Sequence, residues 1–344
     1  EIDPTQRASV QLNLANLAKQ AGKQGEALAL YREALLAEPA GHRGFNYRPR
    51  ANIYSPSGGP SQNRGYYGNP MMNLPQNVFG YIDHQKSQAF NELKQAQKSA
   101  SLSSSDGEQG KEKSAATNFL AELEQVARGY QAGALPAARN RAWESARLLL
   151  GNYFVEKEYD KAAELLAALR KGGMEDIDWF NVSLYLAQQK EEYSGMVALY
   201  DQLQQRYPAR SRDIAVARAG TLIIAKKSDD AAKSIRELSQ QRVPPGTILG
   251  LIDSLIGAGD KKLAKQLLEE HLATVSRNSQ ALTMLAKLSS EDHDYDRAIA
   301  LANEGWERKA HGRQTGNYYY GGYYSYNYYP RYGQADNLGT DRQV

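Results

Sequence analysis

The 344-residue sequence contains no cysteine, which excludes disulfides, thiolate nucleophiles and metal sites built from cysteine. It also has no run of about 18 consecutive apolar residues, so the sequence predicts no membrane-spanning segment. Its 42 basic and 39 acidic residues leave a formal net charge of +3. The chain as a whole therefore lacks the strongly basic character of a nucleic-acid-binding protein.

Recognisable catalytic and metal-binding motifs are missing as well. The sequence has no phosphate-binding Walker loop, no Gly-x-Ser-x-Gly elbow and no dinucleotide glycine fingerprint. Its five histidines are scattered, without an i, i+4 pair: His42, His84, His271, His293 and His311. We interpret Asp292-His293-Asp294 as a solvated turn rather than a metal site. The sequence thus predicts a protein that is not an enzyme and that has no catalytic residue, cofactor or metal.

What the chain does contain is helical periodicity in pairs. Leu14, Leu17 and Ala18 form an apolar stripe, and Gly22 then breaks the helix. A second stripe follows at the same spacing, and a proline ends the unit: Ala27, Leu28, Tyr31, Ala34, Leu35 and Pro39. Two such helices form a hairpin that cannot bury its own apolar faces. The pattern therefore predicts neighbouring hairpins.

Copies of this hairpin recur along the chain. The phrase Glu-Tyr-Asp-Lys-Ala at 158–162 returns as related phrases at 192–196 and 294–298, with weaker copies at 228–231 and 261–264. Each copy places one residue where the second helix meets the first: Ala162, Met196, Ala231, Ala264 and Ala298. Their spacings of 34, 35, 33 and 34 residues indicate tandem repeats.

This pattern resembles the tetratricopeptide-repeat family over residues 1–39 and about 136–310. The first unit matches the family's register at several positions: Leu14, Ala15, Ala18, Ala27, Tyr31, Ala34 and Pro39. The resemblance implies an all-α, right-handed superhelical solenoid of antiparallel helix hairpins that binds other proteins. We expect seven hairpins, with bulky substitutions disfavoured at the alanines of the helix crossings.

Composition divides the chain into four parts. Residues 1–39 hold the end of a preceding repeat and the first helical repeat, and residues 83–310 hold the solenoid, interrupted by a serine-rich loop at 101–113. A Tyr/Arg/Gly/Pro-rich insertion occupies 40–82, and a Tyr/Gly-rich tail occupies 311–344. These two segments contain 14 of the 23 tyrosines and show no helical period. We expect the insertion to pack on a solenoid surface.

Tetratricopeptide arrays bind peptides in a groove lined by their first helices, and the resemblance implies the same groove here. By helical facing, two sets of residues would point into it: Asn16, Lys19 and Gln20, and further along Asn181, Tyr185, Gln188 and Gln189. Asparagine and glutamine can bond a peptide backbone of any sequence. The alternative interpretation is a solvated polar face.

The tyrosine-rich segments are the candidate assembly contacts, since tyrosine combines a large apolar ring, a hydroxyl and little rotamer entropy to lose. The candidates are Tyr47, Tyr54, Tyr66, Tyr67, Tyr318, Tyr319, Tyr320, Tyr323, Tyr324, Tyr326, Tyr328, Tyr329 and Tyr332. Two alternatives are an association-prone tail without a fixed partner and stacking on unpaired bases. The stretch from Gln314 to Gly333 has one arginine, which argues against the latter.

The sequence as a whole favours a non-enzymatic scaffold, a structural protein that assembles with copies of itself into filaments or on a surface. The expected location is extracellular or at the cell surface, with the periplasm or cytoplasm as alternatives. The main alternative function is an adaptor that recruits a different protein through the groove. An RNA-associated protein is a more distant alternative.

Overall fold

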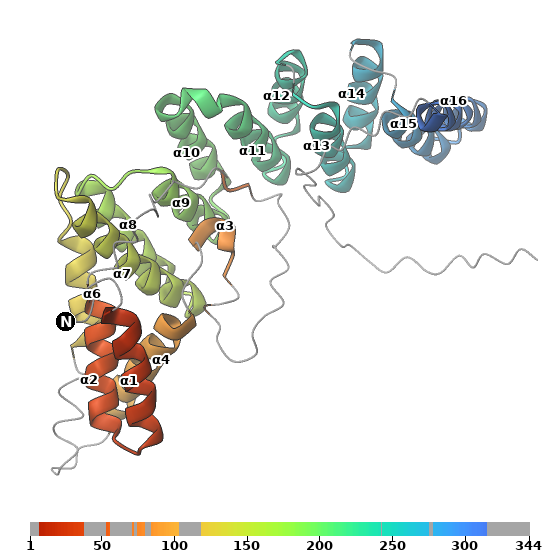
Figure 1. Cartoon of the computed structure of the whole chain (residues 1–344). Helices are drawn as coiled ribbons and strands as arrows, with labels where there is room; N and C mark the ends of the chain where they lie inside the picture. The colour runs from red at the N-terminus through yellow and green to blue at the C-terminus, as the bar shows by residue number, and fades with distance from the viewer. Residues whose placement is uncertain are drawn as a thin grey trace, which may run out of the picture. The chain divides into compact units, whose positions relative to one another are not determined.

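The computed structural model describes residues 7–37, 53–55, 71, 74–79, 84–102, 118–241, 243–274 and 278–314. These residues form helices and their connections, with no strand among them, and the helices follow one another in antiparallel pairs (Figure 1). The predicted all-α fold of tandem helix hairpins is confirmed. The chain divides into two compact units, which are described separately.

The first unit contains the helices up to residue 206. They are α1 (Arg7–Gln20), α2 (Gln24–Leu36), α3 (Gln76–Phe79), α4 (His84–Leu102), α6 (Phe119–Arg128), α7 (Pro136–Val155), α8 (Tyr159–Lys171), α9 (Ile177–Gln189) and α10 (Tyr193–Arg206). The second unit contains η2 (Pro208–Arg210), α11 (Ser211–Ile224), α12 (Ser228–Gln240), α13 (Pro245–Gly257), α14 (Lys261–Thr274), α15 (Ser279–Glu291) and α16 (Tyr295–Gln314).

The core lies along the seams between paired helices. The residues predicted at the helix crossings are all buried: Ala27, Ala162, Met196, Ala231 and Ala264 at 0% exposed, and Ala298 at 9%. The alanine side chains at five of these positions let the two helices of a hairpin approach closely, so the gap fills to the density of a protein interior. The 34-residue spacing read from the sequence is therefore the spacing of the seams.

The turns inside the hairpins share a common geometry where the structure describes them. One residue takes the left-handed conformation in six of them: Gly22, Lys157, Glu191, Lys226, Gly259 and His293, with φ between 57° and 97°. The N–H of that residue donates to the carbonyl three residues back, and the next N–H donates five residues back. This pair of bonds is the Schellman ending of an α-helix. His293 is exposed at its turn.

One prediction for the first helix was wrong. Leu14 and Leu17, expected in the buried stripe, are 46% and 60% exposed. The face of α1 that packs on α2 instead consists of Ala8, Gln11, Leu12, Ala15 and Ala18. The 3,4 spacing marks two apolar faces on this helix, and spacing alone does not tell which one meets the partner helix.

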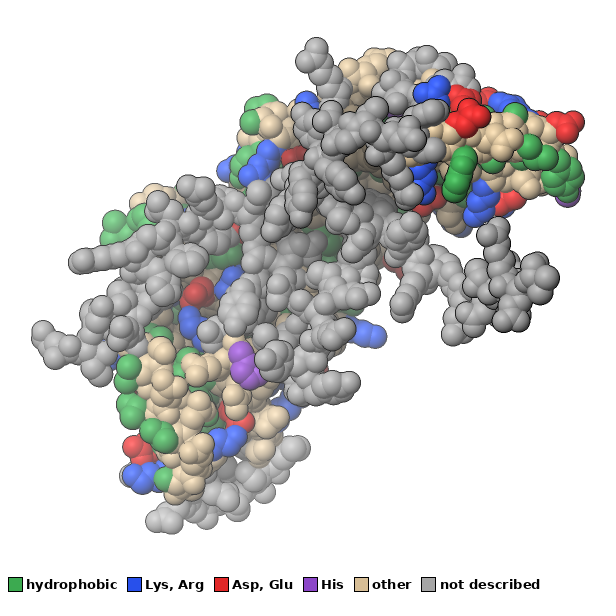
Figure 2. Space-filling model, turned by 45° about the vertical axis from the view of Figure 1, so that its right-hand side comes forward, with side chains coloured by type: hydrophobic (Ala, Val, Ile, Leu, Met, Phe, Trp, Pro, Cys, Tyr) green, Lys and Arg blue, Asp and Glu red, His purple; other side chains and the backbone are tan. Residues whose placement is uncertain are grey.

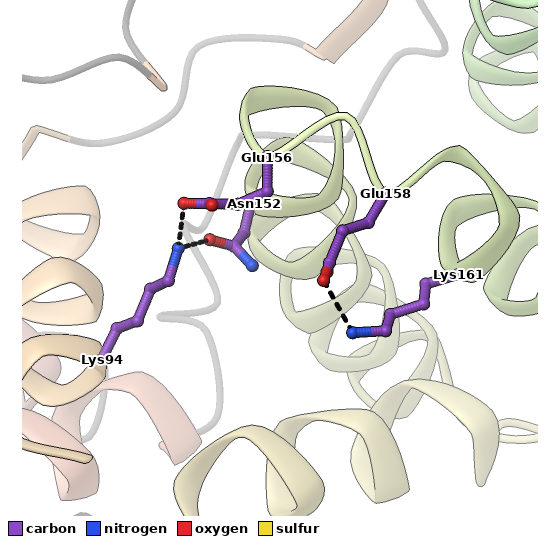
Figure 3. A network of polar contacts seen from close by, with 5 residues as sticks. All are labelled: Lys94, Asn152, Glu156, Glu158 and Lys161. Atoms are coloured by element: carbon purple, nitrogen blue, oxygen red, sulfur yellow. Dashed lines mark hydrogen bonds and ion pairs between the residues drawn. The ribbon is translucent and has the colours of Figure 1, made fainter. Parts of the chain in front are cut away.

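Polar contacts join consecutive hairpins of the first unit. Lys94 of α4 donates to Asn152 Oδ1 at 2.5 Å and to Glu156 Oε1 at 2.6 Å, at the end of α7 (Figure 3). The hydrogen bond and charge of Lys94 lower the pKa of Glu156. Arg32 of α2 donates to both carboxylate oxygens of Glu122 of α6, from Nε to Oε2 at 2.8 Å and from Nη2 to Oε1. Such forked pairs fix the orientation of the two helices.

The described parts of the 40–82 insertion pack on the helices, as expected. Tyr54, Met71, Val78 and Phe79 are 1–5% exposed, and the last two belong to the short helix α3, where no helical structure was expected. The remainder of the insertion lies outside the described residues. α4 extends to Leu102, into the predicted serine-rich loop, and α16 extends to Gln314, into the predicted tail.

Candidate functional site

The candidate site is built on α9, the first helix of the fourth hairpin. Asp176 caps this helix, because its Oδ1 accepts from the N–H groups of Asp178 and Trp179 at 3.1 and 3.0 Å. Arg139 of α7 also donates to the capping carboxylate. This N-cap fixes the residue at which α9 begins. Its residues at i, i+3, i+7 and i+10 then share one face: Asp178, Asn181, Tyr185 and Gln188.

Tyr54 from the insertion binds to this face, and it belongs to neither a helix nor a strand. Its backbone N–H donates to Asn181 Oδ1 at 2.8 Å, and its carbonyl accepts from the Tyr200 hydroxyl at 2.6 Å. Its own hydroxyl donates to Gln188 Oε1. Tyr54 is 5% exposed, and Asn181 and Tyr200 are fully buried. Side chains of α9 and α10 thus replace the backbone partners that a helix or strand would provide.

Aromatic rings form the wall of the site. The Tyr54 ring meets the Tyr185 ring edge-on, with centroids 5.6 Å apart and planes at 87°. Tyr185 in turn contacts Phe79 of α3 at 5.8 Å and Phe154 of α7 at 5.0 Å. Edge-on and tilted contacts at these distances are the favourable ring geometries. Burial raises the pKa of Tyr54 and of Tyr185, so both hydroxyls remain protonated and able to donate.

The predicted groove residues of the first hairpin also come together. Asn16, Lys19 and Gln20 line an open pocket of about 450 Å³ with Gln88 of α4. Asn16 Oδ1 accepts from the Tyr31 hydroxyl at 2.6 Å, and Lys19 Nζ lies 2.6 Å from Glu92 Oε1. Burial, followed by the charge of Glu92, raises the pKa of Tyr31. Because Lys19 is already paired with Glu92, its charge in this pocket is partly neutralised.

The structure corrects one assembly prediction and leaves the others untested. Tyr54 was expected to contact another copy of the chain, yet it is buried within its own chain. The long spacing of 127 residues between Tyr54 and Asn181 carries no local signal, so the sequence could not reveal this pairing. The remaining candidate tyrosines, Tyr47, Tyr66, Tyr67 and Tyr318 to Tyr332, lie outside the described residues. Gln189 is exposed at the end of α9.

Sequence reasoning missed several members of the site. Tyr200 has a signal, since it lies four residues after Met196 on the buried face of α10. That spacing predicts burial but not a bond to Tyr54. Phe79 lies within the insertion and Gln88 shortly after it, in a stretch where no hairpin register could be counted. They therefore had no position relative to the groove.

The arrangement around Tyr54 is suited to binding, because it captures the backbone and the side chain of one residue. Elsewhere in the described part of the chain, no three His, Asp or Glu side chains group as metal ligands would. His271 is 3% exposed, and burial lowers its pKa. No helix within the described ranges combines the length and apolar character needed to cross a membrane.

The helix pairs define the class of protein: an all-α protein of tandem helix hairpins. No protein-family model matches the chain, and no curated protein matches it. Among solved structures, the chain is similar to the crystal structure of yeast Tom70, with 14% identity over 88% of this chain and 78% of that one. The TM-score of 0.30 is low, so the class follows from the hairpins of this chain rather than from that likeness.

Proposed function

We propose that this protein is a non-enzymatic interaction scaffold that associates with copies of itself. The observation that supports the proposal is a pair of exposed apolar faces, one on α1 and one on α16. On α1 this face carries Leu14 and Leu17. On α16 it carries Tyr295, Ile299 and Trp306, which are 57%, 60% and 73% exposed. Soluble proteins rarely leave such stripes without a partner.

The faces equivalent to the α1 face are found in other hairpins by counting back from the left-handed turn residue of each hairpin. Leu14 stands eight residues before Gly22. The residues at this position in three later hairpins are 1–2% exposed: Leu149, Leu251 and Leu285. In each case the preceding hairpin contacts the helix, as α12 contacts α13 and α14 contacts α15. The exposed face of α1 is therefore the face that receives a preceding hairpin.

The exposed face of α16 is likewise buried at the equivalent positions of earlier hairpins. Ala302 stands nine residues after the turn residue His293 and is exposed. The equivalent residues of five earlier hairpins are 0–3% exposed: Tyr31, Leu166, Tyr200, Ile235 and Leu268. Ile299 and Trp306 flank Ala302 on the same stripe. Figure 2 shows hydrophobic side chains among charged ones at the end of the molecule that carries α15 and α16.

The two faces fit one another because they repeat a contact already present inside the chain. α1 of one copy can pack on α16 of another copy, in the same way as each hairpin packs on the one before it within the chain. Such a head-to-tail contact does not close on itself, and it would build an open chain of copies. This supports a self-assembling structural protein of the filament or surface type, which we place outside the cell or at its surface. The tyrosine-rich segments would add contacts between copies.

Two variants test the contact together. Leu17→Glu places a charge on the α1 face, and Trp306→Glu places one on the α16 face. Each variant alone should sediment as a monomer, whereas an equal mixture should form a dimer and nothing longer, because each supplies the face that the other lacks. Leu135→Glu is the control, since Leu135 is 76% exposed and lies outside both faces. An unaltered chain that stays monomeric at about 100 μM, roughly the affinity of a weak but specific contact, would refute the proposal.

A second candidate function is an adaptor that recruits a different protein. The Tyr54 contacts favour it, since they show that the α9 face can hold a residue by its backbone. The two functions do not exclude each other, because the groove and the end faces use different residues.

A further inference from the structure

Tyr54 is held like a bound ligand rather than like a core residue. We infer that Asn181, Tyr185, Gln188 and Tyr200 form a tyrosine-selective peptide site, and that Ile53–Tyr54 is an internal ligand occupying it. The inference rests on the proposed scaffold function in its adaptor form, and it names the ligand class: an extended peptide segment that carries a tyrosine.

The backbone contacts make the site a peptide site. Both polar backbone groups of Tyr54 are bound by side chains, the N–H by Asn181 at 2.8 Å and the carbonyl by Tyr200 at 2.6 Å. Neither bond depends on what the neighbouring side chains are. Any extended residue that reaches this position can make the same two bonds, and a helical residue cannot, because its N–H and carbonyl are committed within the helix.

The side-chain contacts make the site selective. The Tyr54 hydroxyl donates to Gln188 Oε1, and its ring lies edge-on to Tyr185. A phenylalanine would keep the ring contact and leave the Gln188 oxygen without this donor. A site built to bond a hydroxyl rejects the analogue that lacks it. Tyr54 is also 5% exposed in this site, so a tyrosine that carries a negative phosphate would be disfavoured by the cost of burying the charge.

The combination of residues is specific to this hairpin. The residues equivalent to Asn181, ten positions before the turn residue, are mostly apolar elsewhere: Leu12, Arg147, Val216, Leu249 and Thr283. Asn181 is fully buried, and a buried amide is costly without partners. Withdrawal of Tyr54 would therefore break the hydrogen bonds that Asn181, Gln188 and Tyr200 make with it. A tyrosine-bearing segment from another chain supplies all three.

Peptide binding to a chain with an emptied site is the direct test. The probe is a fluorescent peptide with the sequence of residues 50–58, Arg-Ala-Asn-Ile-Tyr-Ser-Pro-Ser-Gly. It should bind the Tyr54→Ala chain at least about ten-fold more tightly than the unaltered chain, where the tethered Tyr54 competes at high effective concentration. Phenylalanine in the peptide should weaken binding about ten-fold, the loss of one net hydrogen bond, and phosphotyrosine should abolish it.

Gln188→Leu in the Tyr54→Ala chain should erase the preference for tyrosine over phenylalanine, while Gln204→Leu, at an exposed position of α10, should preserve it. Equal affinity for the two peptides in the Tyr54→Ala chain would overturn the inference, and so would binding no tighter than to the unaltered chain. If circular dichroism shows that Tyr54→Ala unfolds, Tyr54→Phe takes its place, because it keeps the ring and weakens only the internal ligand. The tyrosine peptide should then bind Tyr54→Phe more tightly than the unaltered chain, and no gain would again overturn the inference.

Self-association is measured separately, by sedimentation of the chain without peptide. Peptide binding to a chain that stays monomeric would support this inference while refuting self-assembly. Association without peptide binding would do the reverse.

Discussion

Asp178 should make the stability of the first unit depend on pH in an unusual direction. Its side chain is 3% exposed, and its Oδ2 has no hydrogen-bond partner in the described part of the chain. Burial raises the pKa of Asp178 from 3.8 to about 6. Because the folded pKa lies above the unfolded one, the folded state is favoured by this group below about pH 4. That contribution is lost as the pH rises through 6.

The magnitude follows from the two pKa values. Each pKa unit corresponds to about 1.4 kcal/mol, so ionising Asp178 in the folded chain costs up to about 3 kcal/mol at pH 7. The position of Asp178 in the first turn of α9 offsets part of this cost, since the helix dipole favours a negative charge there by about 0.3–1 kcal/mol. We therefore expect Asp178→Asn to gain about 2 kcal/mol in free energy of unfolding on going from pH 4 to pH 7, relative to the unaltered chain.

Urea unfolding at both pH values measures this difference, with tryptophan fluorescence as the signal. Trp143 and Trp179 are buried in the first unit, whereas the exposed Trp306 is replaced by phenylalanine in every chain compared. Glu164→Gln, which alters an exposed carboxylate on α8, is the control and should show no such change. A pH-independent difference between Asp178→Asn and the unaltered chain would refute the assigned burial of this carboxylate.

Two further predictions concern the seams and the tail. Ala162 is 0% exposed, so Ala162→Leu should overpack the contact between α7 and α8. The free energy of unfolding should fall by about 1–3 kcal/mol. An unchanged melting temperature would contradict the register of the hairpins. Deletion of residues 314–333 should leave the circular dichroism spectrum of the helices unchanged and weaken self-association in sedimentation, whereas association as strong as that of the unaltered chain would exclude a role for the tail.

The seams were predictable because the burial of small residues at a fixed spacing is a local property of each hairpin. Ala162, Ala231 and Ala264 needed only the repeat period to be placed. Turn geometry was less visible, since Gly22 marks its turn in the sequence but Lys157 and Glu191 take the same left-handed conformation with side chains that rarely favour it. In those hairpins the packing of the two helices imposes the turn.

The α9 site was predictable only in part. Asn181, Tyr185 and Gln188 share a face by helical spacing alone, and the structure brings all three to Tyr54. Their occupant was not predictable, because no periodicity links a residue in the insertion to a helix more than a hundred positions later. The same limit applies to Leu14 and Leu17, whose exposure depends on whether another hairpin covers them.

The bond between Tyr54 and α9 changes how the first unit would respond to force. In a tandem helical array each hairpin contacts mainly its neighbours, so tension on the two ends can peel hairpins away one at a time. Here the hydrogen bond from Tyr54 to Asn181 links a residue that follows the first hairpin in sequence to the fourth hairpin, 127 residues further along the chain. The helices between Tyr54 and Asn181 in the sequence would carry little of the force until this hydrogen bond breaks. Under tension the first unit would then yield in one large step, when Tyr54 leaves its site on α9.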